Sequence, residues 1–254
     1  MKAFIDLHIH SCLSPCSDLD MSPRAIVAGA KAAGLDCIAL TDHGCVENLP
    51  AFHEACTEAG MPCLYGLEAT SVEEVHTLCL FDQLGPALEF GRMIYDAIGD
   101  FPNDPDRFGQ QPIVTVDDEV TGFAEKLLFA ATTISFFDLV PMALEAGALC
   151  IPSHIDRGFG AIVQLGFLPD LPYDAVEVFR PDIPVGVEKW PMVRFSDAHH
   201  PDHIGCRFTE IETNEFTVPA LREALQRLIG KYSLTANSHE LTRIYKGWKI
   251  FFAE

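Results

Sequence analysis

The sequence places histidine and aspartate residues directly after four short apolar runs. These residues are His8, His10, His43, His154, Asp197 and His199. Side chains two positions apart on a strand share a face, so His8 and His10 point together, as do Asp197 and His199. Imidazole with carboxylate suits zinc, manganese or iron better than calcium. The set exceeds the ligands that one ion needs, and it predicts two or three divalent metals with a bridging carboxylate.

Strands that alternate with helices would bring these residues together. The pattern predicts strands over 2–10, 37–40 and 63–67, and helices over 23–33 and 47–59. A further strand over 74–81 follows too closely for a helix, so it predicts a hairpin. Such alternation favours a parallel sheet or barrel, whose working residues follow the carboxyl ends of the strands.

The remaining segments continue an α/β pattern. Helices are predicted over 84–98, 120–131, 135–145 and 217–229, and strands over 148–151, 175–179, 192–195 and 208–212. Residues 99–112 are expected to form a loop, 159–172 to be irregular, and 238–254 to add a last strand or helix. We expect one domain over residues 1–254, with an insertion at about 95–135.

Composition limits the partners. The formal net charge is -20, and the sequence has no evident Lys/Arg cluster, so we expect a small anionic substrate and no duplex nucleic acid. No apolar run approaches the roughly 20 residues that span a bilayer, and the early acidic residue argues against a signal peptide. The sequence therefore predicts a cytoplasmic protein without membrane contact, and it leaves the oligomeric state open.

Four motifs in order resemble the PHP (polymerase and histidinol phosphatase) domain family of metal-dependent phosphoesterases. They are Asp-Leu-His-x-His at 6–10, Thr-Asp-His at 41–43, a lone histidine at 154 and Ser-Asp-Ala-His at 196–199. A Gly-x-Glu element at 66–68, followed by His76, is a further similarity. The resemblance implies a distorted (β/α)7 TIM-like barrel, two or three zinc, manganese or iron ions, and hydrolysis of a phosphate monoester or, in some relatives, a diester.

The resemblance also implies a ligand set. Its members are His8, His10, His43, Glu68, His76, His154, Asp197 and His199. Glu68 would be the bridging carboxylate. Family members commonly place an acidic residue or histidine shortly after the first histidine pair; here that segment is longer, and Asp18 would fill the role, with Asp20 as the alternate.

Other residues are expected to support the chemistry. Asp6 and Asp42 are expected to orient ligand imidazoles. Arg157 and Arg180 would either hold a phosphate or form salt bridges at the rim. The general acid stays open between Asp42 and His203.

The leading hypothesis is hydrolysis of a small phosphate monoester by a metal-bridging hydroxide. One alternative is an amidohydrolase-like enzyme, although no lysine lies at a predicted strand end. Another is a non-catalytic regulatory module that binds metal or a phosphorylated ligand, although the intact ligand set argues against it.

Overall fold

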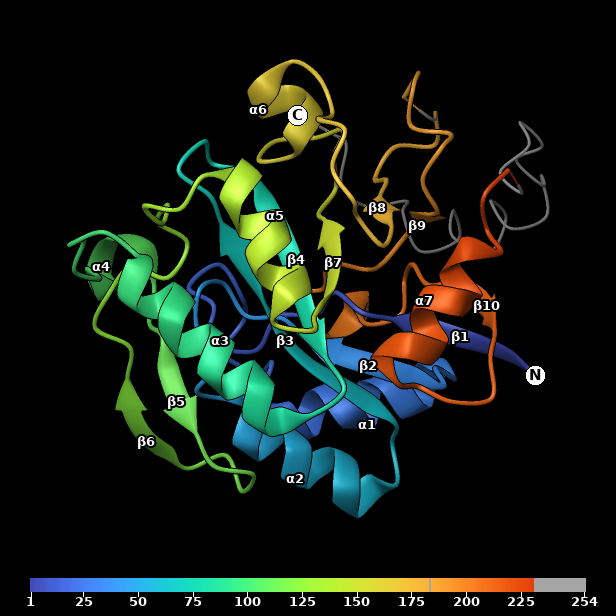
Figure 1. The fold of residues 1–254 in the computed structure, drawn as a ribbon. Coiled ribbons are helices and arrows are strands. Elements are labelled where there is room, and N and C mark those ends of the chain that lie inside the picture. Colours follow the sequence, from blue (N-terminus) through green and yellow to red (C-terminus); the bar gives the residue numbers. More distant parts are fainter. Residues whose placement is uncertain (183, 231–254) are drawn as a thin grey trace, which may run out of the picture.

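The computed structural model describes residues 1–182 and 184–230, and a curled six-stranded sheet forms its centre (Figure 1). The strand order is β10 (Thr209–Glu212), β1 (Lys2–Asp6), β2 (Cys37–Leu40), β3 (Cys63–Thr70), β4 (His76–Phe81) and β7 (Leu149–Pro152). β1, β2 and β3 run parallel. β3 and β4 are antiparallel, which confirms the predicted hairpin.

Helices cover one face of this sheet (Figure 1). They are α1 (Pro23–Ala33), α2 (Leu49–Ala59), α3 (Leu84–Ala97) and α5 (Phe136–Glu145). Strand side chains alternate, so Ile38 and Leu40 pack toward the helices while Cys37 and Ala39 face a second core. α7 (Val218–Gln226) packs against that second core through Leu221.

The helix ends follow from the local sequence. The Ser22 side chain accepts a hydrogen bond from the Ala25 N–H at 3.3 Å, and the next residue, Pro23, opens α1. Gly34 ends α1 with φ 74°, a left-handed conformation that costs glycine little. The Ser135 hydroxyl caps α5 in the same way, by accepting from the Asp138 N–H.

The remaining side of the sheet is less regular. β8 (Val176–Glu177) pairs in parallel with β9 (Met192–Val193) as a separate two-stranded sheet. Several hydrogen bonds link this part of the chain to the main sheet region, among them Ile155 N to Glu177 O at 2.9 Å and His10 N to Ala198 O at 2.9 Å. The structure thus shows an α/β fold with a curled six-stranded sheet, and the closed seven-stranded barrel stays a prediction.

One predicted helix is wrong. Residues 120–131 contain β6 (Val120–Phe123), which pairs antiparallel with β5 (Pro112–Val114). β-Branched residues and glycine in Val-Thr-Gly-Phe disfavour a helix, and pairing with β5 decides the outcome. Two expected irregular segments contain the short helices α4 (Pro105–Phe108) and α6 (Ala161–Leu165). The predicted element over 238–254 lies outside the described residues.

Within the described ranges, none of the helices combines the length and apolar character that crossing a bilayer would require.

Candidate metal centre

The candidate ligands gather beyond the carboxyl ends of the parallel strands. His8 and His10 follow β1, His43 follows β2, and Glu68 lies near the end of β3. β4 runs antiparallel to β3, so its first residue, His76, lies at this same end of the sheet. The antiparallel hairpin therefore brings one more imidazole to the site than purely parallel strands would.

Glu68 lies at the middle of this group. Its side chain is 1% exposed, and its oxygens lie 3.1–3.5 Å from nitrogens of five imidazoles. The five are His8, His10, His43, His76 and His154. A carboxylate with two oxygens among five imidazoles has the position that a bridging ligand needs.

Asp197 and His199 complete the group from the segment after β9. Asp197 Oδ1 lies 3.2 Å from His8 Nε2 and 3.3 Å from His10 Nε2. The rings of His10 and His199 stack with centroids 4.2 Å apart. Possible ligand atoms form three sets, and within each set the atoms lie within 4.8 Å of one another. They are His10 with His43 and His199, His8 with His10 and Asp197, and His43 with Glu68 and His76.

Hydrogen bonds fix which nitrogen some of these rings present. His8 Nδ1 lies 2.9 Å from Glu177 Oε2, and His10 Nδ1 lies 3.0 Å from Ser14 Oγ. Ser14 donates its hydroxyl proton to Asp42 Oδ1 at 2.7 Å, so its oxygen can accept from the imidazole. Both rings therefore donate through Nδ1 and turn Nε2 toward Glu68, the arrangement in which imidazole binds metal.

The buried charges polarise the site. Burial lowers the pKa of His10 to about 3, so that imidazole is neutral. Burial would also lower the pKa of His8, but Asp197, Glu177 and Glu68 outweigh it and raise this pKa well above its usual value. A field that holds a proton on a fully buried imidazole also favours a bound cation.

Several buried polar atoms of the described residues make no hydrogen bond. Among them are His43 Nδ1, Glu68 Oε1, both ring nitrogens of His76, His154 Nδ1 and Asp197 Oδ1. Buried polar atoms are normally satisfied, and most of these border the group around Glu68. Imidazoles, two carboxylates and unsatisfied atoms together fit divalent metal ions, and a bound cation would take the place of the proton on His8.

The predicted supporting carboxylates take different places. Asp42 is 2% exposed, and it accepts hydrogen bonds from Ser11 N at 2.7 Å and from the hydroxyls of Ser11 and Ser14. Because Ser14 also bonds His10, Asp42 orients His10 through Ser14. Asp6 instead accepts from Ser196 N at 3.0 Å and Gly205 N at 3.1 Å. Asp6 thus holds the loop that carries Asp197 rather than an imidazole.

For two other predicted residues, the contacts of the described side chains do not include the imidazole rings. The backbone N–H of Asp18 donates to His199 O at 2.8 Å, but its exposed carboxylate accepts from Asp20 N at 2.9 Å and belongs to none of the clusters found among the described residues. Arg180 is exposed, and its backbone N–H donates to Asp156 Oδ2 at 2.7 Å. Arg157 does reach the site, because its guanidinium donates to Asp197 Oδ2.

Sequence reasoning missed several residues. Glu177 is 3% exposed and holds both His8 and, at 2.9 Å, the backbone N–H of His154. An acidic residue inside the apolar run Ala-Val-Glu-Val-Phe was the available signal. Arg157 and Arg207 both lie over the Phe179 ring, with guanidinium carbons 4.5 and 3.9 Å from its centroid. No spacing in the sequence connects these three residues.

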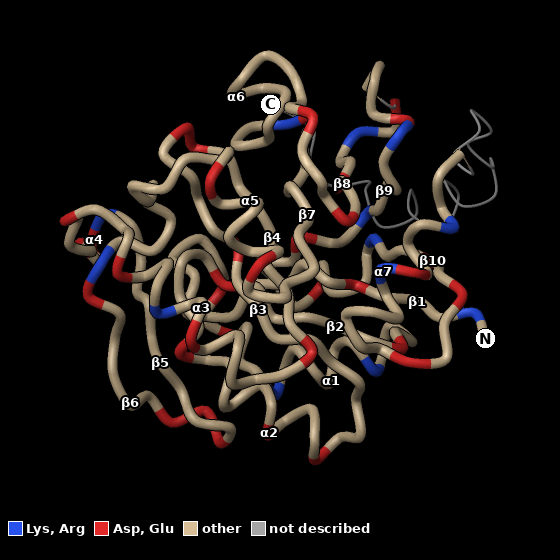
Figure 2. Tube along the Cα trace, in the orientation of Figure 1, with Lys and Arg blue, Asp and Glu red and all other residues tan. Residues whose placement is uncertain are grey.

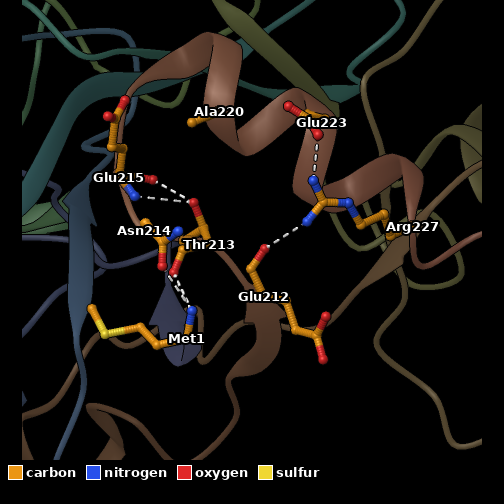
Figure 3. Close-up of a pocket in the computed structure, with 8 residues that line it drawn as sticks. All are labelled: Met1, Glu212, Thr213, Asn214, Glu215, Ala220, Glu223 and Arg227. Atoms are coloured by element: carbon orange, nitrogen blue, oxygen red, sulfur yellow. Dashed lines mark hydrogen bonds and ion pairs between the residues drawn. The ribbon is translucent and has the colours of Figure 1, made fainter.

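A shallow pocket of about 370 Å³ lies away from this group (Figure 3). It surrounds the N-terminal amine of Met1, which donates to Thr213 O at 3.1 Å, and Arg227 borders it. Met1 stands at the start of β1, whereas His8 and His10 follow its end. This pocket is therefore not part of the candidate metal centre.

A curled β-sheet with imidazoles and carboxylates beyond its strand ends defines an α/β protein with a candidate metal centre. The chain belongs to the PHP domain family: the PHP domain model matches residues 6–140, and a PHP-associated model matches residues 190–228. The resemblance predicted from the four motifs is confirmed.

Relatives in sequence include PolC-type DNA polymerase III. The proteins of Oceanobacillus iheyensis and Thermotoga maritima are 38% and 39% identical over 73 and 71 residues. These matches cover 29% and 28% of this chain and only 5% of each polymerase.

Solved structures with a similar fold include a lesion-specific endonuclease from Pyrococcus furiosus. It has TM-score 0.68 and 19% identity, over 91% of this chain and 57% of that chain. A putative metal-dependent phosphoesterase from Bifidobacterium adolescentis has TM-score 0.56 and 19% identity, over 88% and 96%. At these identities the likeness shows the fold.

The expectation that excluded duplex nucleic acid is wrong. Endonuclease Q in complex with a 27-mer duplex that carries an abasic lesion shares the fold, with TM-score 0.61 over 91% of this chain. Formal net charge averages over the whole surface, whereas binding depends on local charge. Arg157 and Arg207 come from separate segments and both lie over the Phe179 ring, and Arg194 Nη2 donates to the backbone oxygen of Arg180, the residue after Phe179, at 3.0 Å.

Proposed function

We propose that this protein is a metal-dependent hydrolase of phosphate esters. The observation that carries the proposal is the position of Glu68, whose oxygens lie within 3.5 Å of five imidazoles at the strand ends. Membership in the PHP domain family supports it. Two or three divalent ions, of zinc, manganese or iron, are the proposed cofactors, and a single domain with an inserted segment is the proposed organisation.

The candidate ligands would bind the metals in groups, one that includes Glu68 with His43 and His76 and one that includes Asp197 with His8 and His10. When bound, divalent metals supply Lewis acidity and lower the pKa of an attacking water. Arg157 uses part of its guanidinium on Asp197 and is 33% exposed, so its other N–H groups can bind a phosphoryl oxygen. Asp42 is buried and accepts three hydrogen bonds, so we assign it a positioning role rather than proton transfer.

A small phosphate monoester is the first candidate substrate, because the centre is compact and buried. A phosphodiester within nucleic acid is the second, and the arginines around Phe179 favour it. Basic and acidic residues are both spread over the molecule, and several of the basic ones lie near β8 and β9 (Figure 2). A cation-rich patch beside the centre is what a polyanionic strand requires.

An amide substrate is the rival within hydrolases. The lysines of the described segments are Lys2, Lys31, Lys126 and Lys189, and each bonds away from the centre, to Glu210, Ala59 O, the backbone near Tyr95 and Asp170. None of these lysines is placed to bridge two metals. This favours a phosphate ester over an amide.

The test is hydrolysis by manganese-reconstituted protein of a panel of phosphate monoesters, phosphodiesters and amides. We expect release from one of the two phosphate ester classes, and we expect His8→Ala to abolish it. His53→Ala, at an exposed position on α2, is the control and should keep full activity. Metal-loaded protein that hydrolyses only amides, or nothing, would refute the proposal and favour the amidohydrolase or regulatory alternative.

A further inference from the structure

The segment His154–Gly160 carries more than a candidate metal ligand. His154 belongs to the group around Glu68, Arg157 contacts Asp197, and Phe159 lies beside His76. The segment is tightly built, because a Cβ atom on Gly160 would meet His154 O at 2.2 Å. Its Asp156 carboxylate also accepts the backbone N–H groups of Phe179 and Arg180, each at 2.7 Å.

Phe159 has an unusual backbone and an unusual exposure. Its φ is 62°, a left-handed conformation that is rare and strained for a bulky residue. Its side chain is nevertheless 47% exposed, so burial of an apolar ring does not offset this strain. Strained residues held in this way concentrate at sites that clamp ligands.

The position of the ring is well defined. It stacks on the ring of His76, with centroids 4.8 Å apart and planes 12° from parallel. Phe159 O also accepts from His76 N at 2.9 Å. His76 is 6% exposed and its Nδ1 lies 3.2 Å from Glu68 Oε1, so only the imidazole separates Phe159 from the middle of the centre. One face of the Phe159 ring is covered by His76, and its large exposed fraction leaves surface for a partner.

We propose that Phe159 is a stacking platform for a nucleobase attached to the scissile phosphate. Aromatic side chains beside a cationic groove bind bases by stacking, without dependence on base identity. Arg157, two residues earlier, would hold the phosphate, and the Phe179–Arg207 pair would lie beside the continuing backbone. The inference rests on the proposed phosphate ester hydrolysis, because it names the group next to the bond that breaks.

The first test measures binding without turnover. Protein kept metal-free with chelator is titrated with fluorescently labelled trithymidylate and with the same trimer carrying an abasic centre. We expect wild type to bind the base-containing trimer roughly 5- to 100-fold more tightly, the range for one stacked base. Phe159→Leu, which still covers His76, should reduce this ratio to near one, whereas Phe159→Trp should preserve it.

Two controls separate stacking from a structural role. Phe167→Leu removes another exposed phenylalanine, 57% exposed, and should leave the ratio unchanged. Metal content of reconstituted Phe159→Leu should equal that of wild type, because the leucine still shields His76. A base-to-abasic ratio that is the same in wild type and Phe159→Leu would overturn the inference.

The second test compares turnover and distinguishes the source of the base. Hydrolysis is measured on thymidine 5′-monophosphate against ribose 5-phosphate, and on the two trimers. A base preference limited to the first pair identifies a mononucleotide, and one limited to the trimers identifies a strand; both support the platform. Hydrolysis with no base preference overturns the platform and leaves the proposed function standing. Base-dependent binding without hydrolysis of any phosphate ester would support the platform and overturn the proposed function.

Discussion

Three histidines of the centre form a hydrogen bond through Nδ1, which leaves Nε2 to bind a metal. The partner of His8 is Glu177, that of His10 is Ser14, and His199 Nδ1 donates to the backbone oxygen of Asp197 at 2.8 Å. Such partners set the tautomer and the direction of a ligand, and they act through another residue rather than on substrate. The strength of metal binding should therefore depend on residues that never touch the metal.

Asp42→Asn tests this dependence. The amide cannot accept all the hydrogen bonds that Ser11 and Ser14 supply, so Ser14 and then His10 lose their fixed orientation. We expect manganese affinity, measured by competition with a chromophoric chelator, to fall about 10- to 100-fold. Asp100→Asn, at an exposed position that is given no role in the centre, is the matched control. Equal affinity in Asp42→Asn and wild type would show that Asp42 does not position His10.

Much of the residue scale could be predicted from the sequence. Histidines after apolar runs predicted the residues that the structure brings together, because strand ends meet at one edge of a sheet. Glu177 carried one signal, its place inside an apolar run, but its pairing with His8 could not be predicted across so long a separation. The contact of Arg207 with Phe179 depends on loops whose path no pattern fixes. The exposed position of Asp18 leaves its ligand role without structural support.

At the scale of elements, a buried asparagine connects α2, the hairpin β5–β6 and the first histidine loop. Asn48 Oδ1 accepts from Val114 N at 2.9 Å, and its Nδ2 donates to Ser11 Oγ at 3.0 Å. Ser11 in turn donates to Asp42. The hairpin is thereby coupled to the carboxylate that orients His10.

Asn48→Ala should destabilise this junction. It leaves the buried Val114 N–H without its side-chain acceptor, which costs about 1–3 kcal/mol of unfolding free energy, whereas the Ser11 hydroxyl keeps its bond to Asp42. Chemical denaturation followed by circular dichroism measures the change. Asn214→Ala, exposed near the N-terminus, should change the unfolding free energy by less than about 0.5 kcal/mol. A similar change in unfolding free energy for both variants would mean that Asn48 does not stabilise this junction.

Element prediction succeeded where periodicity and caps agreed. Ser22 and Gly34 marked the ends of α1, and the short spacing between β3 and β4 indicated a hairpin. It failed at 120–131, where strand pairing with β5 overrides an apolar pattern. Closure of the sheet into a barrel stays a prediction, because β8 and β9 are only two residues long and pair with each other as a separate sheet.

For the whole molecule, an acidic average charge coexists with a local pair of cations. The formal net charge is -20, yet the guanidinium groups of Arg157 and Arg207 both lie over the Phe179 ring. These three residues lie on distant segments, which explains why no cluster was visible in the sequence. Any binding of a polyanion should therefore be local and sensitive to salt.

Arg207→Gln tests the local patch. We expect weaker binding of single-stranded DNA to metal-free protein, and a plot of log affinity against log salt that is shallower by about one. Fluorescence anisotropy at several salt concentrations provides both quantities. Arg24→Gln, on α1 and paired with Glu58, should leave the slope unchanged. An equal slope for Arg207→Gln and wild type would remove this patch as a contact for phosphate.

The most direct measurement is the number of metal ions per chain, by mass spectrometry of native protein, in wild type and Glu68→Gln. The substitution keeps the shape and removes the charge at the middle of five imidazoles. The proposed centre predicts at least two divalent ions in wild type, fewer in Glu68→Gln, and loss of phosphate ester hydrolysis with the missing ions. Wild type that binds no divalent ion, or Glu68→Gln with the full metal content and activity, would contradict a Glu68-centred metal site.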